Sequence, residues 1–121
     1  MGYVVQDTMS YESEANNSRT LNSSFMPHAT RPVLCTYVIE ISVSSTLVLT
    51  EDGYVSLLSD SSSDPVTERS RAGNGYASTV IAATSIVRCE LTHLVQAGNY
   101  VKLVTNGSGN FSIVAQNEII L

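Results

Sequence analysis

The sequence predicts an all-β protein, with a single antiparallel β-sandwich or barrel-like domain at residues 25–121 and an extended N-terminal arm at residues 1–24. Three observations support this prediction. Apolar and polar residues alternate over several short runs, turn residues separate these runs, and no run spaces its apolar residues as an amphipathic helix does. A length of 121 residues suits one domain.

The arm shows no sustained periodicity of apolar residues. Polar residues dominate residues 1–24, and scattered among them are apolar and aromatic side chains. Purely solvated tails seldom contain such residues. We therefore expect an arm that docks on neighbouring subunits, with a disordered tail as the alternative. The candidate contact residues are Tyr3, Val4, Val5, Met9 and Tyr11.

The run VLCTYVIEISVS, after Arg31-Pro32, predicts the first strand of the domain. Its β-branched residues alternate with period two, which is typical of a half-buried strand. One face carries Tyr37, Ile39, Ile41 and Val43, and the other carries Thr36, Val38, Glu40, Ser42 and Ser44.

The middle of the chain predicts shorter strands and one long loop. Thr46–Leu49 is a brief apolar run, and Tyr54–Ser59 reads as a strand. Asp60–Gly75 is polar and aperiodic, which predicts a surface loop. Ser78–Leu91 predicts two strand pieces broken near Ala83-Thr84.

The last residues predict a hairpin and a closing strand. A strand at Tyr100–Thr105 precedes an Asn-Gly loop at Asn106–Asn110. Phe111–Ala115 is expected as the return strand of this hairpin, and Gln116-Asn117 is expected to break it. Glu118–Leu121 is expected as a short final strand. Burial of Ile119, Ile120 and Leu121, within the sheet or against a neighbouring subunit, would be worth roughly 1.5–3 kcal/mol each.

Composition and motifs favour a binding or structural protein over an enzyme. A formal charge of −5 disfavours nonspecific nucleic-acid binding, and no apolar run is long enough to suggest a membrane span. His28 and His93 are the candidate bases, but no strained nucleophile motif accompanies them. We expect no enzyme activity, no cofactor and no metal. Cys35 and Cys89 are expected as buried thiols, and a disulfide would need neighbouring strands.

One pattern resembles a family of small tailed-bacteriophage proteins. It comprises SRTLNSSF at Ser18–Phe25, then Ala29-Thr30-Arg31-Pro32 and Tyr37–Ile41. It continues with VQAGNYVKL at Val95–Leu103 and ends on Asn117–Leu121. The family pattern runs R-S-L-N-x-x-F, then V-P-A-G-Y-Y-V-R-L and G-Q-E-V-L-L. Here Gln96 replaces the proline, Gln116-Asn117 replaces the Gly-Gln pair, and Val104 replaces the family's second arginine, which follows V-P-A-G-Y-Y-V-R-L and precedes a threonine.

The resemblance implies a virion structural protein with no catalytic residues. The first hypothesis is a capsid decoration (cement or minor head) protein on the capsid exterior, assembled in the host cytoplasm. Its partners would be the major capsid protein and further copies of itself, as a homotrimer. The alternative is a tail-fibre tip or receptor-binding module that uses the Asp60–Gly75 loop. A host adhesin or an enzyme accessory domain is a more distant alternative.

Overall fold

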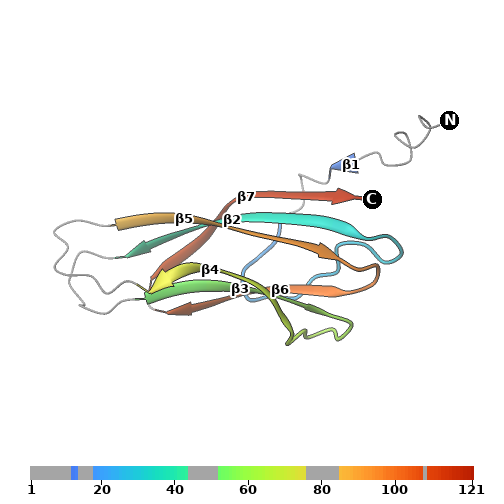
Figure 1. Cartoon of the computed structure of the whole chain (residues 1–121), viewed down its shortest axis with the longest axis horizontal. Coiled ribbons are helices and arrows are strands. Elements are labelled where there is room, and N and C mark those ends of the chain that lie inside the picture. Colours follow the sequence, from blue (N-terminus) through green and yellow to red (C-terminus); the bar gives the residue numbers. More distant parts are fainter. Residues whose placement is uncertain (1–11, 14–17, 44–51, 76–84, 108) are drawn as a thin grey trace.

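A computed structural model describes residues 12–13, 18–43, 52–75, 85–107 and 109–121. Within these ranges the chain forms two facing antiparallel sheets and no helix, which confirms the predicted β-sandwich (Figure 1). The four-stranded sheet has the order β1-β7-β2-β5 and the three-stranded sheet β4-β3-β6, and neither closes into a barrel. The strands are β1 (Glu12–Ser13), β2 (Val33–Val43), β3 (Asp52–Asp60), β4 (Glu68–Gly75), β5 (Ser85–Val95), β6 (Tyr100–Gly107) and β7 (Asn110–Ile120).

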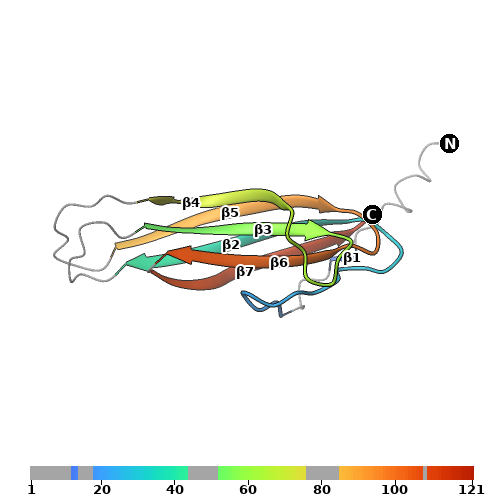
Figure 2. The same cartoon turned by 90° about the horizontal axis from the view of Figure 1, so that it is seen from below.

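Strand β2 lies at the centre of the four-stranded sheet, between β5 and β7 (Figure 2). Its alternate side chains point into the sandwich, as the period-two pattern predicted. Each of these inward residues is at most 1% exposed: Val33, Cys35, Tyr37, Ile39 and Ile41. Strand β5 alternates in the same way, because Leu91 is buried while Arg88 and Glu90 are exposed.

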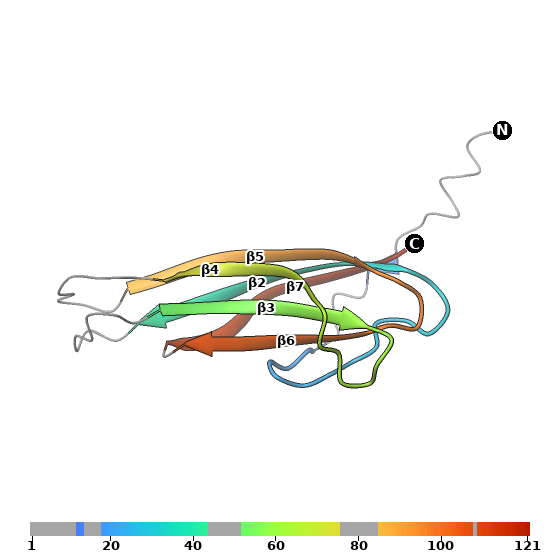
Figure 3. The same cartoon turned by 60° about the horizontal axis from the view of Figure 1, so that its bottom comes forward.

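The three-stranded sheet faces the four-stranded sheet (Figure 3). Its inward side chains supply the other half of the core. Val55 and Leu57 on β3 and Val101 and Leu103 on β6 are completely buried. These residues also alternate along their strands, so each strand turns one face to the core. The two layers therefore depend on each other for burial.

The prediction of one long loop at Asp60–Gly75 is wrong in its second half. The loop covers residues 61–67, and Glu68–Gly75 is strand β4, paired with β3 at the edge of its sheet. The sequence ERSRAGNG shows no apolar alternation, and charged side chains are typical of edge strands. Gly73 adopts a φ of 122°, and a Cβ there would lie 2.7 Å from the Gly53 carbonyl oxygen.

The predicted break at Gln116-Asn117 is also wrong, because β7 runs without interruption from Asn110 to Ile120. Its register with β2 shifts between Val38 and Ile39, which pair with Ala115 and Ile113. Val114 is therefore the extra residue of a β-bulge. The bulge moves the inward face from odd-numbered residues before it to even-numbered residues after it, and this phase change obscured the strand in the sequence.

The two cysteines lie on neighbouring strands but in different register positions. Cys35 pairs with His93, and Cys89 pairs with Ile39, so four residues separate them along the sheet. Four residues of strand span about 13 Å, too far for a disulfide. Both thiols are free, as expected, Cys35 buried and Cys89 half-buried. The predicted features at Thr46–Leu49 and Ala83-Thr84 lie outside the described residues.

Candidate functional site: a segment that bridges the two sheets

Residues 18–25, the bridging segment, cross from β7 in one sheet to β6 in the other. At its start the Arg19 amide donates to the side-chain oxygen of Gln116 on β7 (3.2 Å). At its end Phe25 and Val101 on β6 exchange backbone hydrogen bonds of 2.9 and 2.7 Å. The segment therefore closes the side of the sandwich that is bordered by β6 in one sheet and by β7, with the two-residue β1 beyond it, in the other.

Asn22 holds the middle of the bridging segment against β6. Its amide donates to the Leu103 carbonyl at 2.7 Å, and its side-chain oxygen accepts from the Thr105 amide at 3.1 Å. Asn22 has a φ of 63°, a left-handed conformation that asparagine tolerates better than most residues. The backbone can therefore turn at this residue and return along β6.

A buried ion pair lies beneath the segment. Arg19 Nε and Nη2 donate to the two carboxylate oxygens of Glu118 at 2.8 and 2.7 Å. The side chain of Glu118 is only 2% exposed and that of Arg19 16%. Tyr37, from the centre of β2, donates its hydroxyl to the same carboxylate at 2.5 Å. A buried carboxylate is tolerated when charge-assisted hydrogen bonds satisfy it in this way.

Phe25 packs between the ion pair and the core. The Arg19 guanidinium carbon lies 4.2 Å from the centre of the Phe25 ring, a cation–π distance. The ring of Tyr37 meets Phe25 edge to face, with 6.1 Å between centroids and an interplanar angle of 76°. The bridging segment thus contributes one cation and one aromatic ring to a single cluster with Tyr37 and Glu118.

Burial governs the protonation of the groups beside the ion pair. Desolvation raises the pKa of Tyr37 strongly, and its hydrogen bond to Glu118 contributes in the same direction. Burial is also the main cause that raises the pKa of the Cys35 thiol to about 12. A thiol with so high a pKa is not a nucleophile near neutral pH, so Cys35 serves the core by packing.

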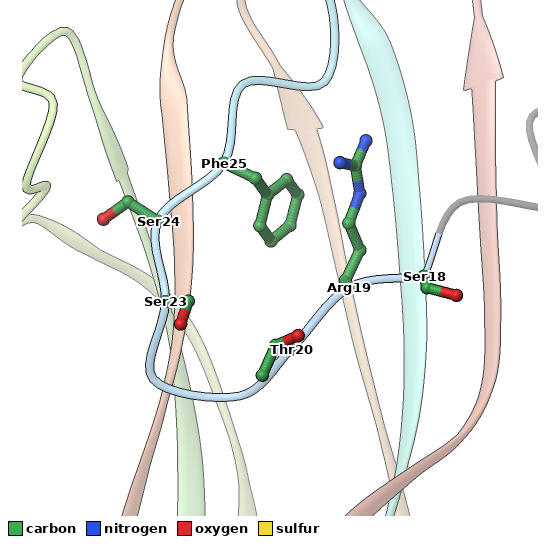
Figure 4. A pocket seen from close by; sticks show the side chains of 6 residues that line it. All are labelled: Ser18, Arg19, Thr20, Ser23, Ser24 and Phe25. Atoms are coloured by element: carbon green, nitrogen blue, oxygen red, sulfur yellow. The ribbon is translucent and has the colours of Figure 1, made fainter.

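A hollow of about 180 Å³ lies on the bridging segment itself (Figure 4). In this view the Arg19 and Phe25 side chains lie beside each other, and the hydroxyl groups of Ser18 and Ser24 point away from them. The lining residues are Ser18, Arg19, Thr20, Ser23, Ser24 and Phe25. The cation of Arg19 is already bound to Glu118.

The two histidines lie in different settings. His28 Nδ1 accepts hydrogen bonds from the amides of Thr30 and Arg31 at 3.2 and 3.1 Å, so it organises its own loop. His93 is half-buried on β5, and desolvation together with the charge of Arg69 lowers its pKa. A lowered pKa favours the neutral imidazole at physiological pH.

Asp60, at the end of β3, binds the loop that follows it. One carboxylate oxygen accepts from the Ser62 amide, and the other accepts from the Val66 amide and from the amide and hydroxyl of Thr67, all within 2.9–3.0 Å. These bonds lower the pKa of Asp60 to about 2. Within the described residues, no group of three or more His, Cys, Asp or Glu is arranged to hold a metal ion.

The predicted contact residues at the C-terminal end have three different environments. Ile120 is 7% exposed and belongs to the core, and Ile119 on the opposite face is half-buried. Leu121 is 37% exposed, but its amide donates to the Pro32 carbonyl and its carbonyl accepts from Arg31. The last strand pairs within its own chain, with β2 and β1.

The predicted arm is described only in part. Tyr3, Val4, Val5, Met9 and Tyr11 lie outside the described residues, so their docking on neighbouring subunits stays a prediction. The residues at 18–24 contact the sheets of their own chain. Sequence reasoning missed the ion pair of Arg19 and Glu118, although both residues belong to the pattern that resembles the phage proteins.

Comparison with known proteins leaves the family of this chain open. No protein-family model matches the chain, and no curated protein matches it significantly. In the part of the chain that the structure describes, no helix is long and apolar enough to cross a membrane.

Proposed function

We propose that the chain is a capsid decoration protein of a tailed bacteriophage, which binds the exterior of the shell and stabilises it. The observation that carries the proposal is the contact between the two ends of the phage-type sequence pattern. Arg19 and Phe25 come from its first part and Glu118 from its last, and they meet in one buried cluster. The parts of the pattern that lie far apart in the sequence are therefore in contact in the fold.

The proposed mechanism uses strand addition by the arm. Glu12 and Ser13 form β1 and add to the free side of β7, opposite Ile120 and Ile119. An extended segment gains backbone hydrogen bonds in this way whatever its side chains, and it can do so on a neighbouring protein too. On a shell, residues 1–17 would cross between major capsid protein subunits. Many such weak contacts together stabilise the shell by avidity.

A pelleting experiment tests the proposal directly. Purified full-length protein is mixed with expanded, undecorated capsids, which are then sedimented and analysed for bound chain. Copurification at near-stoichiometric numbers is the expected result. Binding to intact host cells with none to capsids would contradict decoration and favour the receptor-binding alternative.

Matched variants of the full chain separate the two functions further. The triple substitution Tyr3→Ser, Val4→Ser and Val5→Ser should weaken capsid binding and leave the far-ultraviolet circular dichroism unchanged. The control is Val66→Ser in the 61–67 loop, where the side chain is 77% exposed. This control should bind capsids normally. If Val66→Ser reduces binding and the arm variant does not, the arm is not the capsid contact.

We also propose that three copies of the chain associate as a homotrimer on the shell. Sheets with exposed edges tend to cover them, and closed symmetric assembly is a common solution. A homotrimer should sediment at three times the mass of the chain. Sedimentation equilibrium that shows only monomer at micromolar concentration would contradict a stable trimer in solution.

A further inference from the structure

The two long sides of the sandwich are not equivalent (Figure 2). On one side the bridging segment hydrogen-bonds to β6, and the two-residue β1 adds to β7. On the other side lie β4 and β5. Within the described residues, β4 pairs only with β3 and β5 pairs only with β2. This side therefore presents two strand edges whose outward backbone N–H and C=O groups meet no further strand of the described chain.

Strand β4 has features that protect its edge. Its register with β3 shifts between Glu68 and Ser70, so Arg69 is the extra residue of a β-bulge. The Arg69 side chain donates to the Ser59 carbonyl at 3.0 Å. Near the other end of the strand, the φ of 122° at Gly73 departs from extended geometry. Bulges and irregular geometry are means by which proteins prevent further pairing at an edge.

Strand β5 is regular by comparison. Its 11 residues pair with β2 from end to end without a shift in register. The sequence SIVRCELTHLV contains no Gly, Pro or Lys. Arg88 and Glu90, its residues of opposite charge, are exposed on the outer face of the sheet, because the alternate residue Leu91 is buried. A long and regular edge of this kind is a template for pairing with another strand.

The charges of β5 define one self-complementary register. In an antiparallel pair of two β5 strands, residues directly opposite each other lie at equal distances from the two-fold axis. With the axis at Cys89, Arg88 of each copy lies opposite Glu90 of the other. Moving the axis by one residue places Arg88 opposite Arg88 or Glu90 opposite Glu90, and like charges directly opposite each other are destabilising. The charges therefore favour the register centred on Cys89, in which residues 85–93 of the two strands overlap.

We propose that two copies of this chain associate by antiparallel pairing of their β5 strands about a two-fold axis at Cys89. The four-stranded sheets of the two copies then form one continuous sheet. The occupant of the edge is a second copy because the edge complements itself in charge. Arg88 keeps its ion pair with Glu40 of its own chain, at 3.1 Å, while Glu90 of the second copy approaches from the other side. A two-fold contact joins two copies only, so it is independent of the capsid assignment, and a homotrimer uses another surface.

Disulfide trapping tests this register on the full-length chain. The Cα atoms of directly opposite residues in an antiparallel pair lie about 4.5–5.5 Å apart, which is within the range for a disulfide. Diamide, an oxidant that accepts the two electrons and two protons of a pair of thiols, should link two chains through Cys89. The product is a dimer on a non-reducing denaturing gel, whatever the total mass of the assembly. Cys89→Ser should abolish this dimer, because the remaining thiol, Cys35, is fully buried.

The matched control combines Cys89→Ser with Thr92→Cys. Thr92 is exposed on the same strand, but in this register it lies opposite Ile86. The two copies of residue 92 are then six positions apart, about 20 Å, so the control should give no linked dimer. Absence of a linked dimer from wild type even at hundred-micromolar concentration would overturn the proposal. Equal linking through the cysteine introduced at Thr92 would overturn it too.

Charge substitutions test the self-complementarity of the edge. Glu90→Arg and Arg88→Glu each place like charges opposite each other at two symmetric positions. Each variant alone, with native circular dichroism, should give roughly tenfold less linked dimer than wild type. An equal mixture of the two variants restores opposite charges at both positions, so the yield of linked dimer should return towards that of wild type. A mixture that links no better than either variant alone would show that the two β5 strands do not pair in this register.

Discussion

Two arginines of this protein make almost the same contacts in opposite surroundings. Arg19 donates through Nε and Nη2 to Glu118, and Arg71 donates through the same two nitrogens to Glu68. Each guanidinium carbon also lies 4.2 Å from the centre of an aromatic ring, Phe25 for Arg19 and Tyr54 for Arg71. The side chains of the first pair are 16% and 2% exposed, whereas those of the second are 53% and 38% exposed.

This difference indicates that burial, rather than hydrogen-bond geometry, determines how much each ion pair contributes to stability. Arg71 and Glu68 lie on edge strand β4, where water can replace either partner, so the contact adds little to stability. Glu118 lies under the bridging segment, where water cannot replace Arg19. The first pair therefore ties the segment to the sandwich, and the second occupies an exposed strand edge.

Arg19→Met should give the largest effect on stability. The substitution keeps an apolar side chain over Phe25 but leaves the carboxylate of Glu118 buried without its cation. The free energy of unfolding should fall by about 3–5 kcal/mol. Urea denaturation followed by circular dichroism measures the change. Arg71→Met is the matched control and should leave the transition where it is. Equal losses from the two substitutions would refute the role assigned to burial.

Removing the whole polar cluster should restore most of that stability. The triple variant Arg19→Met, Glu118→Leu and Tyr37→Phe leaves no buried charge and no hydroxyl without an acceptor. Replacing a buried ion pair by packed apolar residues is often neutral or stabilising by about 1–4 kcal/mol. Urea midpoints should therefore rank the triple variant well above Arg19→Met. A triple variant as unstable as the single one would mean that the loss comes from packing and not from the buried charge.

The sequence correctly predicted a strand where apolar and polar residues alternate regularly, and it failed where this alternation is absent or interrupted. Strand β2 has a simple period of two, and its inward face could be assigned from Tyr37, Ile39 and Ile41 alone. Strand β4 could not be recognised because its sequence has no apolar alternation, and its pairing with β3 supplies the structure. In β7 the bulge at Val114 changes the phase of the pattern, so one strand looked like two.

The site was harder to predict than the fold because its parts are far apart in the sequence. Arg19 and Glu118 are separated by 99 residues, and the register of β7 on β2 decides that they meet under the bridging segment. Both residues could be quoted in a sequence pattern, but no local signal indicated their contact. The residues beside Arg19 in the chain are polar, and such a sequence is typical of a solvated segment.

Ile120→Ala and Ile119→Ala compare the two faces of β7 at the same end of the strand. Ile120 is 7% exposed and belongs to the core, so its truncation should cost about 2–3 kcal/mol. Ile119 lies on the outer face, and its truncation should cost under about 1 kcal/mol. Urea denaturation measures both. A larger loss for Ile119 than for Ile120 would mean that the outer face is the more deeply covered one.

Asp60 extends the comparison to a half-buried carboxylate at the surface that receives several hydrogen bonds, and its expected effect is the smallest. The bonds from Ser62, Val66 and Thr67 hold its pKa at about 2, below the ordinary value of 3.8. The ionised form therefore stabilises the fold at pH values above the ordinary pKa, and this contribution disappears as the pH falls through about 2. Asp60→Asn lacks the titrating group and replaces one acceptor oxygen by a donor. Wild type should accordingly unfold at a slightly higher urea concentration than Asp60→Asn at about pH 6, and the gap should close by about pH 2. A gap that stays constant over this range would show that the loss comes from the altered shape of the loop and not from the charge.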